Sequence, residues 1–120
     1  MHNYIYQLNI VNMPRIVSYD ETNKVMKMQR IYGSNVADFY GENISGIPSS
    51  VLTSISDILT KLTSNNIEYP DITGYNFMID EDSNEVWIID FEHAKHNDNI
   101  TDEFILGSCE QIKKWNPDFA

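Results

Sequence analysis

Three oxygen-bearing side chains stand at spacings that suit the binding of a metal-bound phosphate. Asp71 and Asn76 lie five residues apart in one polar loop, and Asp90 follows a short apolar stretch further along the chain. A carboxylate can orient and deprotonate an accepting hydroxyl, while an amide oxygen and a second carboxylate can hold Mg²⁺ on nucleotide phosphates. The three residues are therefore a candidate set for phosphoryl transfer, provided that folding brings them together.

The elements that must position this set are a hairpin and a helix. Asn76–Ile79 and Val86–Ile89 are short β-rich runs joined by the polar segment Asp80–Glu85, a pattern typical of a β-hairpin. Ahead of the loop, from Pro48 to Asn66, apolar residues recur at helical spacing and form one stripe: Val51, Leu52, Ile55, Ile58, Leu59 and Leu62. We expect this helix to lead the chain into the loop that carries Asp71.

The N-terminal part of the chain is predicted to be mostly β-structure. Tyr4–Val11 alternates apolar and polar residues, with Tyr4, Tyr6, Leu8 and Ile10 on one side, which predicts a strand. Arg15–Tyr19 and Val25–Ile31 flank the turn-prone segment Asp20–Lys24, which predicts a first hairpin. Gly33–Gly41 favours a short helix or turn, and Gly41–Gly46 a loop.

The C-terminal part predicts a last helix from Thr101 to about Trp115. Asp102 and Glu103 would lie at its positive end and Lys113 and Lys114 at its negative end. Cys109 suits a small core position on that helix better than a nucleophile. Strands and helices are thus mixed, and the expected class is α+β in a single domain of 120 residues.

Composition excludes several classes of protein. A formal charge of −10, from 8 Lys and Arg against 18 Asp and Glu, argues against nucleic-acid binding, which needs a cationic face. A single cysteine excludes an internal disulfide and a four-cysteine zinc site. No apolar run approaches the roughly 18–20 residues that span a bilayer, and Met1–Met13 does not resemble a secretory signal. We expect an intracellular, cytoplasmic protein without a membrane partner.

Simpler interpretations of the polar residues stay open. Asp71 and Asn76 could be turn residues that bond nearby backbone. The tip Asp80–Glu85 begins like a calcium loop, but Glu85 and Phe91 stand where that loop needs Gly and Glu, so calcium is disfavoured. His93 and His96, near Glu92 and Asp98, could form a zinc site, although a polar loop is the better interpretation.

The loop, hairpin and Asp90–Phe91 pair together resemble the protein-kinase-like superfamily, whose motifs are H-R-D-x-x-x-x-N and D-F-G. Asp71 would be the catalytic aspartate, and Asn76 and Asp90 would hold Mg²⁺. Asp71–Asn76 is closest to atypical kinases of the Bud and Rio types, and Ile89–Ala94 is similar to choline and ethanolamine kinases. The resemblance implies a truncated kinase-like α+β fold, with small-lobe strands in 1–32 and a large-lobe core in 33–120.

The same resemblance implies further roles and leaves clear gaps. Gln29 and Ile31 would contact the nucleotide at the hinge, and three residues would have structural roles: Tyr69, Phe91 and Asp102. The Gly-rich phosphate loop, the strand lysine and its glutamate partner have no counterpart in the sequence. Since that mechanism needs the Lys–Glu pair and the metal site together, half of the electrostatic stabilisation has no visible source.

Three functions follow as hypotheses. The first is a degenerate kinase that keeps part of an ATP–Mg²⁺ site and acts as a binding or scaffold module. The second is an active phosphotransferase acting on a protein Ser/Thr or a small alcohol. The third is an unrelated α+β interaction domain. A first hairpin without neighbouring strands leaves a bare sheet edge, so we expect either that Tyr4–Val11 covers it or that a protein partner or a second copy does.

Overall fold

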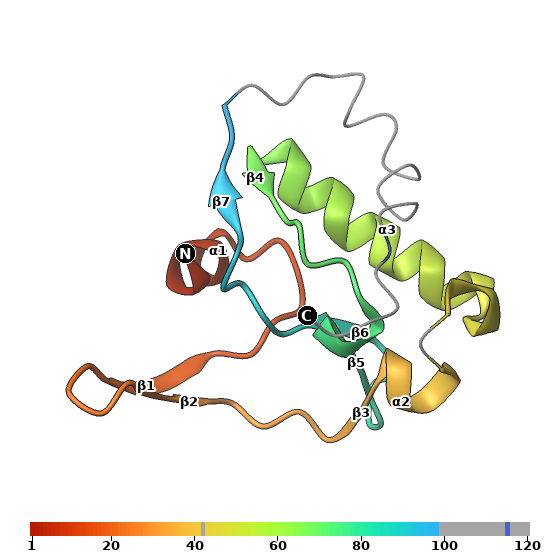
Figure 1. The fold of residues 1–120 in the computed structure, drawn as a ribbon, viewed down its shortest axis with the longest axis horizontal. Coiled ribbons are helices and arrows are strands. Elements are labelled where there is room, and N and C mark those ends of the chain that lie inside the picture. The colour runs from red at the N-terminus through yellow and green to blue at the C-terminus, as the bar shows by residue number, and fades with distance from the viewer. Residues whose placement is uncertain (42, 99–114, 116–120) are drawn as a thin grey trace.

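The chain forms an α+β fold, as the sequence predicts. The computed structural model describes residues 1–41, 43–98 and 115 (Figure 1). Three helices, two 3₁₀ turns and seven strands occur in these ranges, in the order α1 His2–Leu8, β1 Ile16–Asp20, β2 Val25–Met28, β3 Gly33–Asn35, α2 Val36–Tyr40, η1 Ile44–Gly46, α3 Ser49–Ser64, β4 Ile67–Glu68, η2 Gly74–Asn76, β5 Phe77–Asp80, β6 Val86–Ile88 and β7 Lys95–His96.

The predicted long helix is confirmed as α3, and it supplies one wall of the core. It begins directly after Pro48, whose fixed φ suits a helix start, and ends near Asn65 and Asn66. The apolar stripe faces inward: Ile55, Leu59 and Leu62 have no exposed surface, whereas Val51 and Leu52 are half-buried at the helix start. Burial of this stripe stabilises α3 more than helix propensity does, because Ser and Thr are frequent in it.

The predicted second hairpin is also confirmed, and a third strand joins it. β5 and β6 pair antiparallel, with Phe77 opposite Ile88, and β3 adds to the other side of β5, with Asn35 opposite Met78. Side chains of the hairpin alternate between the core and the other face, so that Phe77 and Ile88 are fully buried. The segment Gly33–Gly41 is therefore a short strand followed by α2.

The prediction of a strand at Tyr4–Val11 is wrong, because the segment forms helix α1. Ile5 is fully buried and Leu8 half-buried, which is a helical spacing, while Tyr4 and Tyr6 are exposed. The His2 ring packs edge-on against Phe91, with the ring centres 5.3 Å apart, and its Nε2 donates to the Pro14 carbonyl. Contacts with distant residues thus decide the conformation of α1, not the local alternation.

The first hairpin is confirmed, but its predicted cover is not. β1 and β2 pair only with each other and form a two-stranded ribbon that projects from the rest of the molecule (Figure 1). The N-terminal segment does not pair with it. A small sheet that the sequence did not predict forms from β4 and β7, with Ile67 opposite His96.

Three further predictions concern the C-terminal helix, the loop at Gly41–Gly46 and the absence of a membrane-spanning helix. The predicted C-terminal helix, with Asp102 and Cys109, lies outside the described residues. The predicted loop Gly41–Gly46 contains the 3₁₀ turn η1. Of the helices in the described ranges, none combines the length and the apolar character needed to cross a bilayer.

A single methyl group should disrupt the central sheet. A Cβ added at Gly33 would lie 1.8 Å from the Ile79 carbonyl oxygen, so Gly33→Ala must force β3 away from β5. We expect a loss of about 1–3 kcal/mol in the free energy of unfolding, measured by chemical denaturation. The neighbouring Ser34→Ala, at an exposed position of the same strand, is the control and should change little. Equal stability of both variants would contradict the pairing.

Candidate functional site

The antiparallel register of β5 and β6 brings Asn76 and Asp90 together. Beyond the paired residues Phe77 and Ile88, the ladder continues by one further bond, in which the Ile89 N–H donates to the Asn76 carbonyl at 3.0 Å. Asp90 follows Ile89 directly, so it leaves the hairpin beside Asn76. Its Oδ1 accepts the Glu92 N–H at 2.9 Å, which orients the carboxylate in a tight turn.

Asp71 is held in position by two hydrogen bonds, one with Asn76 and one with His93. The buried Asn76 amide donates through Nδ2 to the Asp71 carbonyl oxygen at 2.9 Å, which fixes the loop. The Asp71 carboxylate accepts from His93 Nδ1 at 2.7 Å, and both side chains remain partly exposed. The turn-residue interpretation therefore holds for the Asn76 amide nitrogen, but the Asp71 carboxylate bonds a distant side chain.

Tyr69 lies beneath these groups in an aromatic cluster. Its ring packs edge-on against Phe91 and Phe77, with ring centres 5.8 and 6.3 Å away. Tyr69 and Phe91 are 5% exposed each, and Phe77 is fully buried. The cluster packs the loop, β5 and the segment after β6 against one another. It thereby helps to fix the positions of Asp71, Asn76 and Asp90.

The electrostatics of Tyr69 show that the two carboxylates are close to its hydroxyl. Burial raises the pKa of the Tyr69 phenol above its ordinary value, and the negative charges of Asp90 and Asp71 raise it further. The Asn76 amide is also near this oxygen, but its nitrogen is directed to the Asp71 carbonyl. Tyr69 therefore stays a neutral phenol among groups that come from three separate segments.

Buried polar atoms without a hydrogen-bond partner are concentrated around this loop and one end of the hairpin. Among side chains of the described residues they are Tyr69 Oη, Thr73 Oγ1 and Trp87 Nε1. A buried polar atom without a partner costs about 1–3 kcal/mol, so each such atom needs an explanation, and a ligand or an ordered water is the usual one. Two of the three belong to the loop that carries Asp71.

The third atom, Trp87 Nε1, belongs to a residue that lines a cavity of about 190 Å³ together with the predicted nucleotide contacts Gln29 and Ile31. Arg30, Tyr32, Asp80 and Asp82 complete its walls. Asp80 and Asp82 belong to the turn of the hairpin, so the cavity lies toward that turn, whereas Asn76 and Asp90 lie at the open end of the hairpin.

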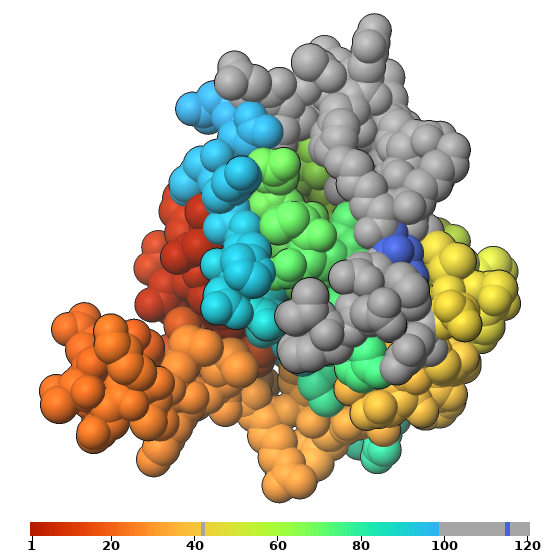
Figure 2. All heavy atoms as spheres, in the orientation of Figure 1, coloured from red at the N-terminus to blue at the C-terminus, as the bar shows by residue number. Residues whose placement is uncertain are grey.

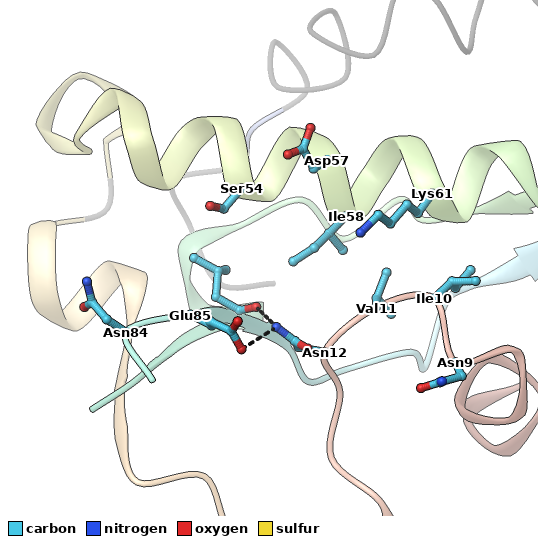
Figure 3. Close-up of a pocket in the computed structure, with 11 residues that line it drawn as sticks. Asn9, Ile10, Val11, Asn12, Ser54, Asp57, Ile58, Lys61, Asn84 and Glu85 are labelled. Atoms are coloured by element: carbon cyan, nitrogen blue, oxygen red, sulfur yellow. Dashed lines mark hydrogen bonds between the residues drawn. The ribbon is translucent and has the colours of Figure 1, made fainter. Parts of the chain in front are cut away.

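A larger cavity, of about 360 Å³, opens elsewhere (Figure 3). It lies between α3, the segment after α1 and the turn before β6, and Asn12 at its edge donates to Glu85 and to the Val86 carbonyl. None of Asp71, Asn76 and Asp90 lines it. The larger cavity therefore lies away from the side chains that could bind a metal or a phosphate. The chemistry of the side chains locates the candidate site better than cavity size does.

The other metal-site interpretations have no geometric support in the part of the chain that the structure describes. No three His, Cys, Asp or Glu side chains are grouped there in a way that could hold a metal ion. In the turn Asp80–Glu85, the Asp80 carboxylate accepts the Asp82 N–H and the Ser83 hydroxyl, as in a capped turn. Asn76, whose amide oxygen is a possible ligand, is outside that set of residue types.

Similarity to known proteins is limited in extent. No protein-family model matches the chain. The chain is 30% identical over 95 residues to a probable bifunctional tRNA threonylcarbamoyladenosine biosynthesis protein of Methanococcus vannielii. The match includes 79% of this chain but only 16% of the length of that relative.

Assignment of the chain to the protein-kinase-like superfamily is therefore wrong as a family assignment. It depended on two short motifs, while no family model matches and the similarity to the relative covers a small part of that protein. A few residues at a fixed spacing are a weak signal, because a family pattern also needs the phosphate loop and the lysine that this sequence lacks. The geometry around Asp71 must be judged by its own chemistry.

Two residues of the site were not predicted from the sequence. The sequence favoured a polar loop for His93 over a zinc site, and it gave Trp87 no role in the site. His93 lies 22 residues from Asp71, and no spacing rule links residues across an intervening hairpin. The indole nitrogen of Trp87 became notable only when its burial without a partner was seen, which is a property of the folded chain.

The contact between His93 and Asp71 should make stability depend on pH. The hydrogen bond and charge of Asp71 raise the pKa of His93, so the contact stabilises the fold below the unfolded-state pKa of about 6.5 and is lost as the pH rises through the raised value. His93→Gln should therefore lower the melting temperature more at about pH 5.5 than at about pH 8.5.

An Asp71→Asn background serves as the control for this measurement. Without the Asp71 carboxylate, the effect of His93→Gln should depend much less on pH, since the largest cause of the raised pKa is gone and only the smaller effects of Glu92 and Asp90 remain. A pH-independent effect of His93→Gln in the wild-type background would show that the contact does not persist in solution.

Proposed function

We propose that the chain binds a magnesium-bound nucleoside triphosphate such as ATP and acts as a binding or scaffold module, without efficient phosphoryl transfer. The observation that supports this most is the distribution of unsatisfied polar atoms. Tyr69 Oη and Thr73 Oγ1 lie in the loop of Asp71, and Trp87 Nε1 belongs to the residue that shares a cavity with Gln29 and Ile31. The protein is kinase-like in the chemistry of its site rather than by family.

The donor set at the hairpin's open end fits Mg²⁺. The ion is bound by hard oxygens, commonly one or two from the protein with phosphates and waters completing the octahedron. Asn76 keeps its amide oxygen, because its nitrogen makes the bond to Asp71, and Asp90 has one carboxylate oxygen outside its turn. When bound, the ion would neutralise phosphate charge, and Asp71 would stand next to the terminal phosphate.

Charge around the site favours binding over catalysis. Among the described residues, Lys95 pairs with Glu68, and no Lys or Arg forms an ion pair with Asp71 or Asp90. Phosphoryl transfer needs fixed positive charge around the transferred group, in addition to the metal. A site made of two carboxylates, an amide and a phenol holds a metal-bound phosphate but stabilises its transition state poorly.

One observation favours weak phosphotransfer as a second candidate. The Asp71 carboxylate is partly exposed and held by His93, as a general base for an accepting hydroxyl would need to be. In this reading, Asp71 accepts the proton of a Ser/Thr or small-alcohol hydroxyl, the γ-phosphoryl group of ATP passes to the hydroxyl oxygen, and ADP leaves. Transfer of labelled phosphate from ATP that disappears in Asp71→Asn would favour this candidate over a pure binding module.

The relative's name suggests a setting for the protein. It refers to the biosynthesis of a modified tRNA nucleoside, and we propose an intracellular role next to such a process. The net charge of −10 argues against direct contact with tRNA, so a protein partner would make that contact. The chain covers 16% of the relative's length, which leaves most of that protein's activity without a counterpart in the matched segment.

Loss of the metal ligands should remove nucleotide binding. We expect Mg²⁺-dependent ATP binding by isothermal titration calorimetry, abolished by chelation of the metal. Asp90→Asn and Asn76→Ala should each weaken affinity by about tenfold or more, because a charge-assisted contact contributes about 1.5–3 kcal/mol. Asp57→Asn, which removes a carboxylate from the larger cavity, is the matched control and should bind normally. No heat of binding at millimolar ATP would contradict the proposal.

Trp87 should affect recognition of the base but not of the phosphates. Trp87→Phe keeps an aromatic ring and removes the indole N–H, so ATP should bind about fivefold more weakly, equivalent to one hydrogen bond. Inorganic tripolyphosphate with Mg²⁺ is the matched probe, and its affinity should be unchanged by Trp87→Phe yet reduced by Asp90→Asn. Equal losses for both probes would place Trp87 outside a base site.

A further inference from the structure

The ribbon of β1 and β2 carries a group of exposed apolar side chains. Val17 is 58% exposed and Tyr19 55%, while Met26 and Met28 are 42% and 39% exposed. All four residues of β2 are exposed, and the ribbon protrudes from the surface (Figure 2). Single exposed apolar residues are common, but a contiguous patch of them on one element marks an interaction surface.

The register shows that Tyr19, Met26 and Met28 share one face. Cross-strand partners lie on the same face, and the pairs Tyr19–Met26 and Ser18–Lys27 follow each other on opposite faces. The register then passes directly to Ile16 opposite Met28, so Val17 is an extra, bulged residue. The bulge resets the alternation and brings Ile16 to the side of Tyr19, Met26 and Met28.

The ribbon therefore has an apolar face and a polar face. We call the side formed by Ile16, Tyr19, Met26 and Met28 the apolar ribbon face. The opposite side carries Ser18, Asp20 and Lys27, with Val25 the one apolar exception. A two-stranded hairpin is marginally stable in water unless an apolar face of it is packed against something. The rest of the described chain does not cover this face.

The distribution of charged residues along the chain indicates what covers the apolar ribbon face. Residues 15–30 hold four of the eight Lys and Arg and two of the eighteen Asp and Glu, a net +2, whereas the remaining residues carry −12. Arg15 and Arg30 are at the open end of the ribbon, whereas its turn holds Asp20, Glu21 and Lys24, with a net charge of −1. Two ribbons stacked in opposite directions would place the acidic turn of each over the basic open end of the other.

We propose that the chain forms a two-fold symmetric dimer in which the apolar ribbon faces of two copies pack against each other, antiparallel, about 10 Å apart. Tyr19 and Met26 form the centre of the contact, and the charges of the turn and the open end form its rim. Four side chains per copy make an interface below the usual size of about 1,600 Å², so dissociation occurs in the micromolar range.

Sedimentation velocity and light scattering on the full chain test this dimer. Between about 5 and about 200 µM, the mass should rise from 13.9 kDa toward roughly twice that value. Tyr19→Glu should hold the protein at the monomer mass throughout, whereas Ser18→Glu, with the same charge change on the next residue and the opposite face, should still dimerise. A wild-type mass that stays at 13.9 kDa, or equal behaviour of the two variants, would overturn the proposal.

A charge-reversal pair tests the antiparallel arrangement and does not depend on the apolar residues. Glu21→Arg and Arg15→Glu should each weaken the dimer by several fold, because each places like charges together at the rim. The double variant should restore the wild-type dissociation constant, since the turn and the open end again carry opposite charges. Additive losses in the double variant would overturn the antiparallel arrangement. Far-UV circular dichroism confirms that all variants are folded.

Discussion

The candidate site depends on one backbone constraint, the antiparallel register of β5 and β6. The ladder ends where the Asn76 carbonyl accepts the Ile89 N–H, and this bond makes Asn76 and Asp90 neighbours although a hairpin separates them along the chain. The Asn76 amide then fixes the backbone of Asp71. A shift of β6 by one residue against β5 would turn the buried side chains of β6 to the other face and move Asp90 relative to Asn76, so the burial of Phe77 and Ile88 maintains the site as well as the sheet.

Stability and binding are opposed around the loop. The aromatic cluster of Tyr69, Phe77 and Phe91 needs a buried ring at position 69, yet that burial leaves the phenol oxygen without a partner near two carboxylates. Groups left in this state raise the energy of the free protein. A ligand that supplied hydrogen bonds to them would recover part of that energy.

Unlike the core, the ribbon of β1 and β2 keeps its apolar side chains exposed and is held by a hydrogen-bonded turn. Asp20 caps the turn between its strands: the Asp20 carboxylate accepts the Asn23 side-chain amide and the N–H groups of Asn23 and Thr22, and these hydrogen bonds lower the pKa of Asp20. The apolar side chains of Tyr19 and Met26 remain exposed in the described chain. An acidic molecule that keeps its cationic segment on a projecting ribbon places that segment where a second molecule can reach it.

Local sequence patterns were sufficient where burial and period agree. The stripe through Ile55, Leu59 and Leu62 specified α3, and the turn residues between Ile79 and Val86 specified the second hairpin, because each pattern reports which side faces the core. The same alternation misled at Tyr4–Val11, where packing of Ile5 and His2 against distant residues selects a helix. Only the tertiary structure could join His93 to Asp71, or show that Trp87 Nε1 and Tyr69 Oη lack partners. These features depend on residues that are far apart in sequence and meet only in the folded chain. A local periodicity reports neighbours along the chain and cannot predict them.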